Sequence, residues 1–413
     1  MIKWVISVRY IEKIFGAVEN TNHNVDIHIK GQNLIVVGGN GSGKTSFLRS
    51  VFARIKNNIV EEQFLNLKQF SANVKIYQEA LVNADEAQAI QYKEELAKNE
   101  NYIAVIKGRL SVDYNDPAAF IDLKRRKLAV VKLFEADRKA AIQDVKFASG
   151  SLVSFGEVDV DASLGNNLEQ HLVNLHVRTA LGAQKTGNDT RLEEINKWFS
   201  SFEKNLKYLF EDESTHLNFD PDRFKFTIRQ EGKPEYNFQN LSSGYLSVFD
   251  IYADLLMRSE YLQVIPEELF GAVLIDELDA HLHVSLQRKI FPFLSRSFPN
   301  IQFIVTTHSP FVLTSVDNAL IFDLTTNQES HDLSMYSFEA VVEGLLGVPP
   351  ISKKLEETIK SLAEATDGDG FDVAEAESIL KKITPYIDSL DDESLMFYQM
   401  AVNKIIKMRA GEA

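Results

Sequence analysis

Residues 38–45, with the sequence Gly-Gly-Asn-Gly-Ser-Gly-Lys-Thr, restrict the fold of this chain more than any other stretch. An apolar run, residues 34–37, precedes them, and a helix-like segment, residues 46–52, follows. Glycines let the backbone curl so that consecutive N–H groups converge with the dipole of the next helix, which makes a cradle for phosphate groups. A glycine turn without a ligand is the alternative, but the spacing and both flanks agree with the cradle. The pattern therefore predicts a strand, a nucleotide-binding loop and a helix.

Two side chains of this loop have expected tasks of their own. Lys44 is expected to reach the β- and γ-phosphates, and the Thr45 hydroxyl is expected to bind Mg²⁺. ATP and Mg²⁺ are accordingly the expected ligands. The residues predicted to hold the nucleotide are Gly38, Asn40, Gly41, Ser42, Gly43, Lys44, Thr45 and Ser46.

The composition limits the surroundings in which the chain works. With 413 residues, 45% of them hydrophobic, it can bury a large core and is long enough for two or more structural units. It contains no cysteine, which excludes disulfides and thiolate metal sites and is compatible with a reducing compartment. The N-terminal residues lack a signal-peptide core, and no apolar run approaches a membrane span. We therefore expect a cytoplasmic protein without a membrane partner.

The net charge of the chain indicates which kinds of partner it can bind. A formal net charge of -15 argues against binding of nucleic acid over the whole surface, because such binding rests on phosphate neutralisation by Lys and Arg. The nearest to a basic patch is the run of four cations at 124–127, and such a run is more often a solvated turn. Contact with nucleic acid is therefore expected to be indirect.

The first half of the chain alternates between strand and helix patterns. Near-alternation at 4–10 and 25–29 predicts an antiparallel pair of strands. Residues 51–110 are rich in helix formers and predict a helical hairpin inserted into the nucleotide-binding core. The apolar run at 128–134 predicts a buried strand, and its polar exit is either near the nucleotide or an ordinary surface loop. The residues of that exit are Glu135, Asp137 and Arg138.

A serine-rich motif follows a set of helices and strands. Helical periodicity covers 168–183 and 191–209, and strand signals lie near 217–219, 223–228 and 236–238. The motif Leu-Ser-Ser-Gly-Tyr, residues 241–245, then stands at the start of an apolar-faced helix. By itself it is explained by helix capping through Ser242 or Ser243.

Two hydrophobic strands end in polar residues suited to phosphate chemistry. The strand at 271–275 ends in Asp276 and Glu277, and buried strands rarely end in paired acids without a reason. Asp276 fits the acid that helps to hold Mg²⁺, and Glu277 is placed to orient or deprotonate an attacking water. The strand at 301–307 ends at His308, whose imidazole is expected to meet a γ-phosphate. Thr306, Thr307 and Ser309 are explained by capping of the following helix.

These four motifs together resemble the ATP-binding-cassette ATPases, specifically the soluble branch of SMC proteins, zinc-hook repair ATPases, RecF and OLD-like ATPases. In the resemblance, residues 38–45 match the phosphate loop and residues 241–245 match the signature, with Ser242, Ser243 and Gly244 acting on the nucleotide of a partner head. Asp276 and Glu277 match the magnesium acid and the catalytic acid, and His308 matches the switch histidine. Asp279 falls in the segment that resembles the dimer-contacting loop.

Further details refine the resemblance. The signature reads Ser-Ser-Gly, nearer to the SMC and repair branch than to transporters. Residues 278–283, Leu-Asp-Ala-His-Leu-His, followed by Gln287, look like the LHLH segment of OLD-like proteins, which gives His281 and His283 a structural role; metal binding is the weaker alternative. No glutamine could be assigned to the family's Q-loop.

The resemblance also implies function. The unbroken run 168–228, the signature variant and the helical tail look like the stand-alone ATPases of anti-phage systems such as Septu and PARIS. We therefore expect an ATPase that forms ATP-sandwiched head dimers and controls a separate effector, such as a nuclease. A DNA-repair or DNA-structure ATPase acting directly on DNA is the alternative, and a transporter motor fits less well.

The expected architecture is an α/β head with a mixed sheet flanked by helices. The expected last strand is 319–324, and helix follows from residue 339, which leaves no room at this end for the nuclease domain of OLD proteins. The expected domains are residues 1–56, the first part of the head with the phosphate loop; 57–110, the helical insertion; 111–338, the remainder of the head; and 339–413, a helical tail.

Overall fold

A central sheet of six strands organises the larger part of the molecule. In the computed structural model, which describes residues 10–138, 142–145, 160–182, 189–345, 351–366 and 372–411, the order of these strands differs from their order in the chain. Their bounds are β3 (Asn33–Val37), β5 (Ala129–Phe134), β9 (Phe270–Ile275), β10 (Ile301–Thr306), β11 (Ala319–Asp323) and β12 (Gln328–His331). The order across the sheet is β12-β11-β3-β10-β9-β5, parallel except for β12, so the expected mixed sheet is confirmed.

Two smaller antiparallel sheets accompany the central one. The first has the order β2-β1-β4, and the second has the order β6-β7-β8. Their bounds are β1 (Ile11–Ala17), β2 (Asn24–Ile27), β4 (Leu110–Tyr114), β6 (His216–Asp220), β7 (Lys225–Arg229) and β8 (Tyr236–Asn237). An antiparallel pair, β1 and β2, does precede the phosphate loop, and β2 lies in the second predicted stretch. The first strand is not where the alternation at 4–10 predicted it, because β1 starts after Tyr10. The other residues of that alternation, 4–9, lie outside the described residues.

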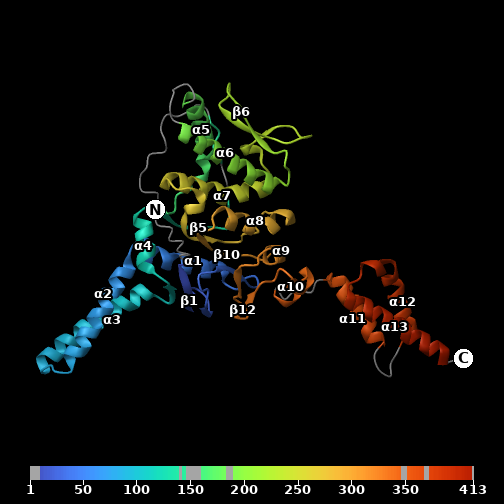
Figure 1. Ribbon diagram of the computed structural model, residues 1–413. Helices are drawn as coiled ribbons and strands as arrows, with labels where there is room; N and C mark the ends of the chain where they lie inside the picture. The colour runs from blue at the N-terminus through green and yellow to red at the C-terminus, as the bar shows by residue number, and fades with distance from the viewer. Residues whose placement is uncertain are drawn as a thin grey trace. The chain divides into compact units, whose positions relative to one another are not determined.

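Helices surround these sheets and make up the rest of the chain. Their bounds are α1 (Lys44–Ile55), α2 (Gln63–Leu81), α3 (Glu86–Lys107), α4 (Pro117–Arg125), α5 (Leu168–Gly182), α6 (Asp189–Phe210), α7 (Ser243–Leu262), α8 (Val284–Ser297), α9 (Pro310–Leu313), α10 (Phe338–Gly344), α11 (Lys353–Thr366), α12 (Val373–Ile383) and α13 (Asp392–Gly411). Figure 1 shows α1 on one side of the central sheet and α7 and α8 on the other.

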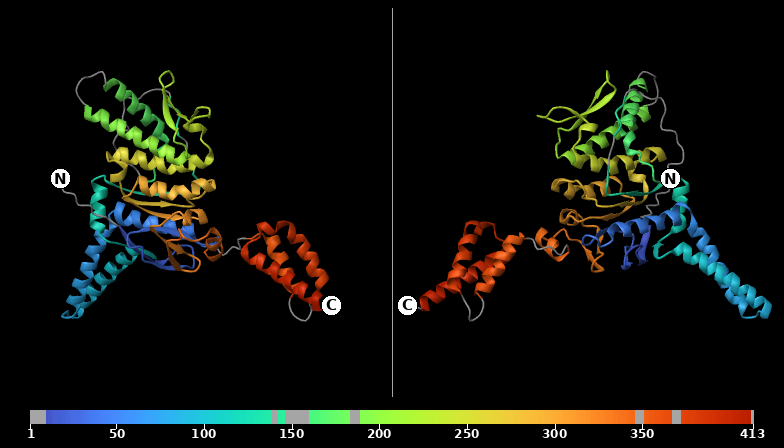
Figure 2. Two further views of the ribbon diagram at one scale, coloured as in Figure 1. Left: turned by 45° about the vertical axis from the view of Figure 1, so that its right-hand side comes forward. Right: turned by 180° about the vertical axis from the view of Figure 1, so that it is seen from behind.

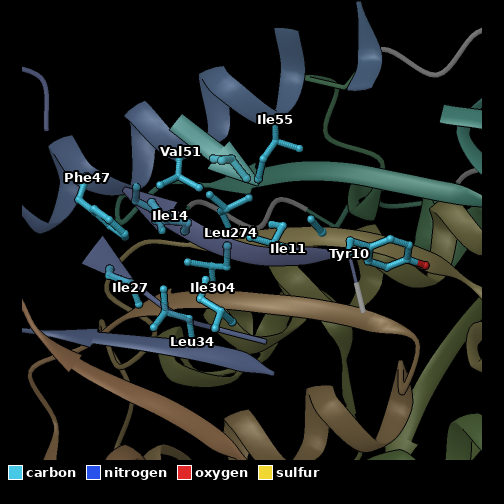
Figure 3. Packing of buried hydrophobic residues seen from close by; sticks show 14 of the residues in the cluster. Tyr10, Ile11, Ile14, Ile27, Leu34, Phe47, Val51, Ile55, Leu274 and Ile304 are labelled. Carbon is cyan, nitrogen blue, oxygen red and sulfur yellow. The ribbon is translucent and has the colours of Figure 1, made fainter. Parts of the chain in front are cut away.

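Alternation along the buried strands explains this layering. Successive side chains of a strand point to opposite faces, so Leu34 and Val36 face one side while Ile35 faces the other. The first face joins α1 and the β2-β1-β4 sheet in one hydrophobic core, in which Phe47 and Val51 are fully buried (Figure 3). On the opposite face, Phe303 of β10 meets Phe291 of α8 with ring centroids 6.2 Å apart. Both faces of the central sheet are therefore covered.

The predicted helical hairpin is present as α2 and α3, which lie side by side in both views of Figure 2. Phe70 and Tyr102 stack across it at 5.0 Å, and Asp85 begins α3 with a capping box shared with Gln88. No residue of α2 is buried, and the buried residues of α3 are Asn99 and Ile106. The hairpin is therefore held by contacts between its own helices and by its base.

The chain divides into two compact units, Met1–Val341 and Val342–Ala413. We call the first unit the head. It contains two strands that the sequence patterns did not predict. β4 follows the helical hairpin and pairs with β1, and β12 follows β11 and pairs with it antiparallel, so 319–324 is not the last strand. The second unit is helical, as predicted, and its own core is formed by α11, α12 and α13. Within the described residues, no helix has both the length and the apolar character needed to cross a membrane.

Candidate functional site

The predicted site residues gather at one edge of the central sheet. β3, β9 and β10 run parallel in register, with Ile304 paired to both Leu34 and Leu274. Parallel strands present their carboxyl ends at the same edge, which is where open α/β sheets bind ligands. The segments leaving these three strands are the phosphate loop, residues 276–279 and residues 307–309.

The phosphate loop has the backbone that its glycines predict. Gly38, Gly41 and Gly43 have positive φ angles of 148°, 77° and 88°. A Cβ atom on Gly43 would lie 2.6 Å from the Thr21 methyl group, so the loop tolerates no side chain there. Asn40 is exposed at the tip, and Ser46 lies in the first turn of α1.

Lys44 is buried, with 7% of its surface exposed, and its ammonium donates hydrogen bonds to the carbonyl oxygens of Gly38 at 2.8 Å and Gly39 at 3.1 Å. The Ser42 hydroxyl is buried without a hydrogen-bond partner in the described part of the chain. Burial lowers the pKa of Lys44, whereas the nearby carboxylates of Glu277 and Asp276 raise it. The loop thus holds one cation and one unpaired hydroxyl around its curled backbone.

Asp276 links the phosphate loop to the neighbouring strands. The Thr45 hydroxyl donates to its Oδ2 at 2.8 Å, and the Thr306 hydroxyl donates to its Oδ1 at 2.6 Å. The carboxylate is 2% exposed, and its backbone N–H donates to the carbonyl of Phe134 at the end of β5. Both oxygens of the acid are therefore oriented by hydroxyl groups from separate elements.

Glu277 stands in an unusual backbone conformation. Its φ angle is 45°, in the left-handed region that non-glycine residues seldom occupy, and its side chain is exposed. Its N–H donates to the Thr306 hydroxyl at 2.7 Å, and its carbonyl accepts a hydrogen bond from the Arg138 guanidinium. Arg138 also donates to the carbonyls of Asp276, at 2.8 Å, and Leu278, at 3.5 Å. Strained residues persist where their surroundings fix them, and these bonds fix Glu277.

Asp279 lies beside His308. Thr306 and Thr307, at the end of β10, have a different role from the expected helix capping. The Oδ1 atom of Asp279 accepts hydrogen bonds from the Thr307 hydroxyl and from the backbone N–H of His308, the latter at 3.2 Å. Thr306 and Thr307 thus bind the acids that follow β9 and do not cap a helix. Ser309 alone caps α9, by accepting from the N–H groups of Phe311 and Val312.

Burial, and then the charge of Lys44, lower the pKa of His308, while the surrounding acids oppose the shift. Because an unperturbed histidine has a pKa of about 6.5, the imidazole is neutral at pH 7. Its ring can then donate one hydrogen bond from one nitrogen and accept one at the other.

The signature serines do not cap their helix. Ser242 occupies the position before α7, but its side chain makes no capping bond, and both Ser242 and Ser243 are exposed. In the described part of the chain neither hydroxyl has a hydrogen-bond partner. The capping expectation is therefore wrong, and the local pattern of residues could not reveal how the hydroxyls are oriented. Gly244 is buried, and a Cβ there would lie 3.1 Å from the carbonyl oxygen of His281.

The two histidines of residues 278–283 differ in what they contact. His283 caps α8, where its side chain accepts from the N–H of Ser285, and His281 supplies the carbonyl that contacts Gly244. Gln287 bonds both the carbonyl of Leu282 and the hydroxyl of Ser309. Among the described residues, no cluster of acids and histidines suited to a metal ion was found, so metal binding by these histidines gains no support.

Comparisons with known proteins match parts of this chain to ATPases and to one domain family. A family model described as "AAA domain, putative AbiEii toxin, Type IV TA system" matches residues 153–314. The Retron Ec83 probable ATPase of Escherichia coli is 45% identical over 92 residues, which are 22% of this chain and 17% of that protein. The Septu protein PtuA of Bacillus thuringiensis is 30% identical over 167 residues, which are 39% of each chain. Both matches span well under two thirds of the relative's length.

The chain resembles SMC-like ABC-type ATPases of anti-phage systems. Among solved structures, the SmcHead bound to the C-winged helix domain of ScpA aligns over 79% of this chain and 100% of that one, with 14% identity and a TM-score of 0.36.

Sequence reasoning missed part of this site. The polar exit of β5 was left open between the nucleotide's neighbourhood and an ordinary surface loop. The structure brings Arg138 against the backbone of residues 276–278, whereas Glu135 pairs with Arg49 of α1 on the surface. Thr325, which accepts a hydrogen bond from the N–H of Gly39 at 3.1 Å, carried no signal in the sequence.

The residues present fit a nucleotide and a hard divalent cation. The curled loop, the unpaired Ser42 hydroxyl and the Lys44 ammonium suit phosphate oxygens, and the oxygens of Thr45 and Asp276 are the kind that Mg²⁺ prefers. Glu277, Asp279 and Asp323 add negative charge near Lys44. A cation that accompanies the phosphates would offset that charge.

Proposed function

We propose that the chain is an ATP-binding and ATP-hydrolysing subunit of a bacterial anti-phage complex, in which paired heads enclose ATP and control a separate effector protein. The observation that carries this proposal is the 2.8 Å hydrogen bond between the Thr45 hydroxyl and Asp276 Oδ2. It joins the phosphate loop to the acid after β9, two elements 231 residues apart in the chain. Together they form the pair that phosphoryl-transfer ATPases use to hold the phosphates and their cation.

The residues that hold the nucleotide in this proposal are those of the curled loop and the start of α1. Backbone N–H groups of Gly41, Ser42 and Gly43 surround the phosphates, Lys44 reaches the terminal ones, and Asn40 and Ser46 lie at the two ends. Thr45 and Asp276 would hold Mg²⁺, which when bound would offset the negative charge of the phosphates.

Glu277 and His308 have separate tasks at the γ-phosphate. Glu277 orients the attacking water and accepts its proton, because its exposed carboxylate follows directly on the residue that holds the cation. His308, neutral at pH 7, donates a hydrogen bond to a γ-phosphate oxygen. Asp279 accepts a hydrogen bond from the backbone N–H of His308 and so holds the segment after β9 against the segment after β10.

The paired arrangement rests on the signature. Ser242 and Ser243 are exposed at the start of α7, a 20-residue helix whose N-terminal end attracts anions. Gly244 packs against the carbonyl of His281, which fixes that end of the helix. A second head would therefore supply the phosphate oxygens to which these hydroxyls donate, and the first head would complete the other site.

The defence role and the effector are inferred from similarity to relatives. The matched proteins are a retron ATPase and a Septu protein, and the net charge of -15 disfavours direct clamping of DNA. The effector is proposed to be another chain, such as a nuclease, and cytoplasmic like the ATPase.

Two variants test the ATPase itself. Lys44→Ala is expected to abolish binding of a fluorescent ATP analogue, whereas Glu277→Gln is expected to bind it and to stall before hydrolysis. Equal loss of ATP binding in both variants would show that Glu277 is not the residue that acts only in hydrolysis. If the unsubstituted protein hydrolysed almost no ATP even with its genomic neighbours present, the result would favour a different function. The chain would then be a scaffold that nucleotide binding locks in place without hydrolysis.

The complex is tested with the stalled variant. Glu277→Gln, expressed with its genomic neighbours and purified in Mg-ATP, is expected to double its mass by light scattering and to retain an effector that mass spectrometry identifies. Lys44→Ala, treated identically, should remain at the monomer mass. A Glu277→Gln protein that has the same mass with and without Mg-ATP, and no pre-formed oligomer, would rule out the paired heads. A bare dimer that shifts on addition of DNA would favour a repair ATPase instead.

A further inference from the structure

A cavity of about 430 Å³ lies in the head between α6, α7, α8 and the turn at Pro266–Glu268. No residue of the phosphate loop, and none of those following β9 and β10, lines it. Its volume falls within the range of roughly 300 to 1,000 Å³ that is typical of small-molecule sites. The cavity is therefore large enough for a ligand other than the nucleotide.

One wall of the cavity is a stack of three aromatic rings. Trp198 and Phe202 of α6 lie with centroids 5.4 Å apart and planes 15° apart, and Phe202 and Tyr252 of α7 lie 6.1 Å and 12° apart. All three side chains line the cavity. Phe202 and Tyr252 are each 2% exposed, so the accessible ring of this row is that of Trp198. Because aromatic rings pair best when offset and parallel or edge to face, Trp198 favours a flat aromatic guest.

The rim of the cavity carries a surplus of positive charge. Lys197, Lys204 and Arg296 line it together with Glu194 and Glu267, which leaves three cations against two acids. The Arg296 guanidinium stacks on the Tyr208 ring, 4.0 Å from its centroid. In a chain with a net charge of -15, this local surplus points to an anion.

From these features we propose that the cavity is a second ligand site, which takes a small, planar aromatic anion. The ring stacks along Trp198, and the anionic group lies at the rim near Lys197 and Lys204. The proposal does not depend on the assignment of the ATPase site.

The chain carries its own reporter for this site, because its two tryptophans are Trp4 and Trp198. In a Trp4→Phe background, binding of the aromatic sulfonate 1-anilinonaphthalene-8-sulfonate is followed by energy transfer from Trp198. Ser201 of α6 is exposed and lines the cavity, so Ser201→Phe fills the site from outside and is expected to weaken binding about tenfold or more. The matched control is Ser200→Phe, at an exposed position one residue earlier that does not line the cavity.

Charge is tested with a neutral probe of the same shape, N-phenyl-1-naphthylamine. The sulfonate should bind about two- to fivefold more tightly than the neutral amine, and Lys197→Glu with Lys204→Glu should abolish that preference. Lys207→Glu, on the same helix but outside the lining, should preserve it. Equal binding to the Ser201→Phe and Ser200→Phe proteins would overturn the site, as would displacement of the probe by Mg-ATP. Equal affinity for the two probes would overturn the anionic ligand.

Discussion

The guanidinium of Arg138 donates a hydrogen bond to the backbone carbonyl of Glu277 and reaches the carbonyls on either side of it as well. Arg138 follows β5, and Glu277 follows β9, so the bond spans two strand exits that the parallel pairing of these strands brings together. It contributes to holding Glu277 at its positive φ angle. Arg138 is therefore a positioning residue for the proposed general base.

Replacing Arg138 by Gln should slow hydrolysis without weakening ATP binding. Small misplacement of a reacting group costs up to about a hundredfold in rate, and we expect kcat to fall by about ten- to a hundredfold. The Kd for ATP should stay within about twofold, because the phosphate loop is unchanged. Arg138→Lys, which keeps a donor, should restore part of the rate.

The control for Arg138 is Arg49→Gln. Arg49 of α1 pairs with Glu135 on the surface, and exposed pairs contribute only about 0 to 1 kcal/mol, so its loss should leave kcat unchanged. An Arg138→Gln protein that turns over ATP at the normal rate, or that loses ATP binding in parallel with kcat, would contradict the positioning role.

Thr306→Val should raise the Mg²⁺ concentration needed for half-maximal ATP hydrolysis. The substitution keeps the shape of the side chain but removes the hydroxyl that donates to Asp276 and accepts from the N–H of Glu277. Loss of such an outer hydrogen bond typically lowers metal affinity about ten- to a hundredfold. Thr306→Ser retains the hydroxyl and should behave normally in the same Mg²⁺ titration. An unchanged Mg²⁺ requirement in Thr306→Val would show that Thr45 alone orients the acid.

Gly43→Ala and Gly39→Ala form a matched pair in the phosphate loop. Gly43 has a φ angle of 88° and no room beside Thr21, so alanine at this position should lower the free energy of unfolding by about 1–3 kcal/mol and weaken ATP binding. A Cβ on Gly39 would meet no atom within 4 Å, so Gly39→Ala should fold normally. Thermal unfolding and ATP titration of the two proteins check this. Equal stability would mean that the loop relaxes around the methyl group added in Gly43→Ala at no cost.

Gly244→Ala should weaken ATP-driven pairing of heads while leaving ATP binding by a single head intact. The added methyl group would stand 3.1 Å from the His281 carbonyl, so the start of α7 has to move by a few tenths of an ångström, and the signature serines move with it. Light scattering of the Glu277→Gln, Gly244→Ala double variant in Mg-ATP should show a larger fraction of monomer than Glu277→Gln alone. The same dimer fraction in both proteins would show that the position of Gly244 does not affect the interface between heads.

Local patterns predicted the parts of the site that depend on neighbours in sequence. The apolar run before Gly38 and the helix after Thr45 both form as the spacing indicates, and the strand ending at Asp276 does so too. What the patterns could not supply is which groups meet across strands. Thr306 bonds Asp276, and Arg138 reaches Glu277, only because β10 and β5 flank β9 in the sheet. Ser242 illustrates the same limit, because its position marks a helix start, but the orientation of its hydroxyl does not follow from that position.

The helical hairpin has an evolutionary consequence. Its base is tied to the rest of the head, where Arg54 of α1 donates to the carbonyls of Ile106 and Leu110 and Glu62 pairs with Arg125. Because no residue of α2 is fully buried, its outward-facing positions carry little penalty for folding, whereas Phe64 and Phe70, which pack against the core and against Tyr102, remain constrained. The sequence of the arm is thus expected to diverge unevenly, fast on its outward face and slowly at its base and along the seam between its two helices.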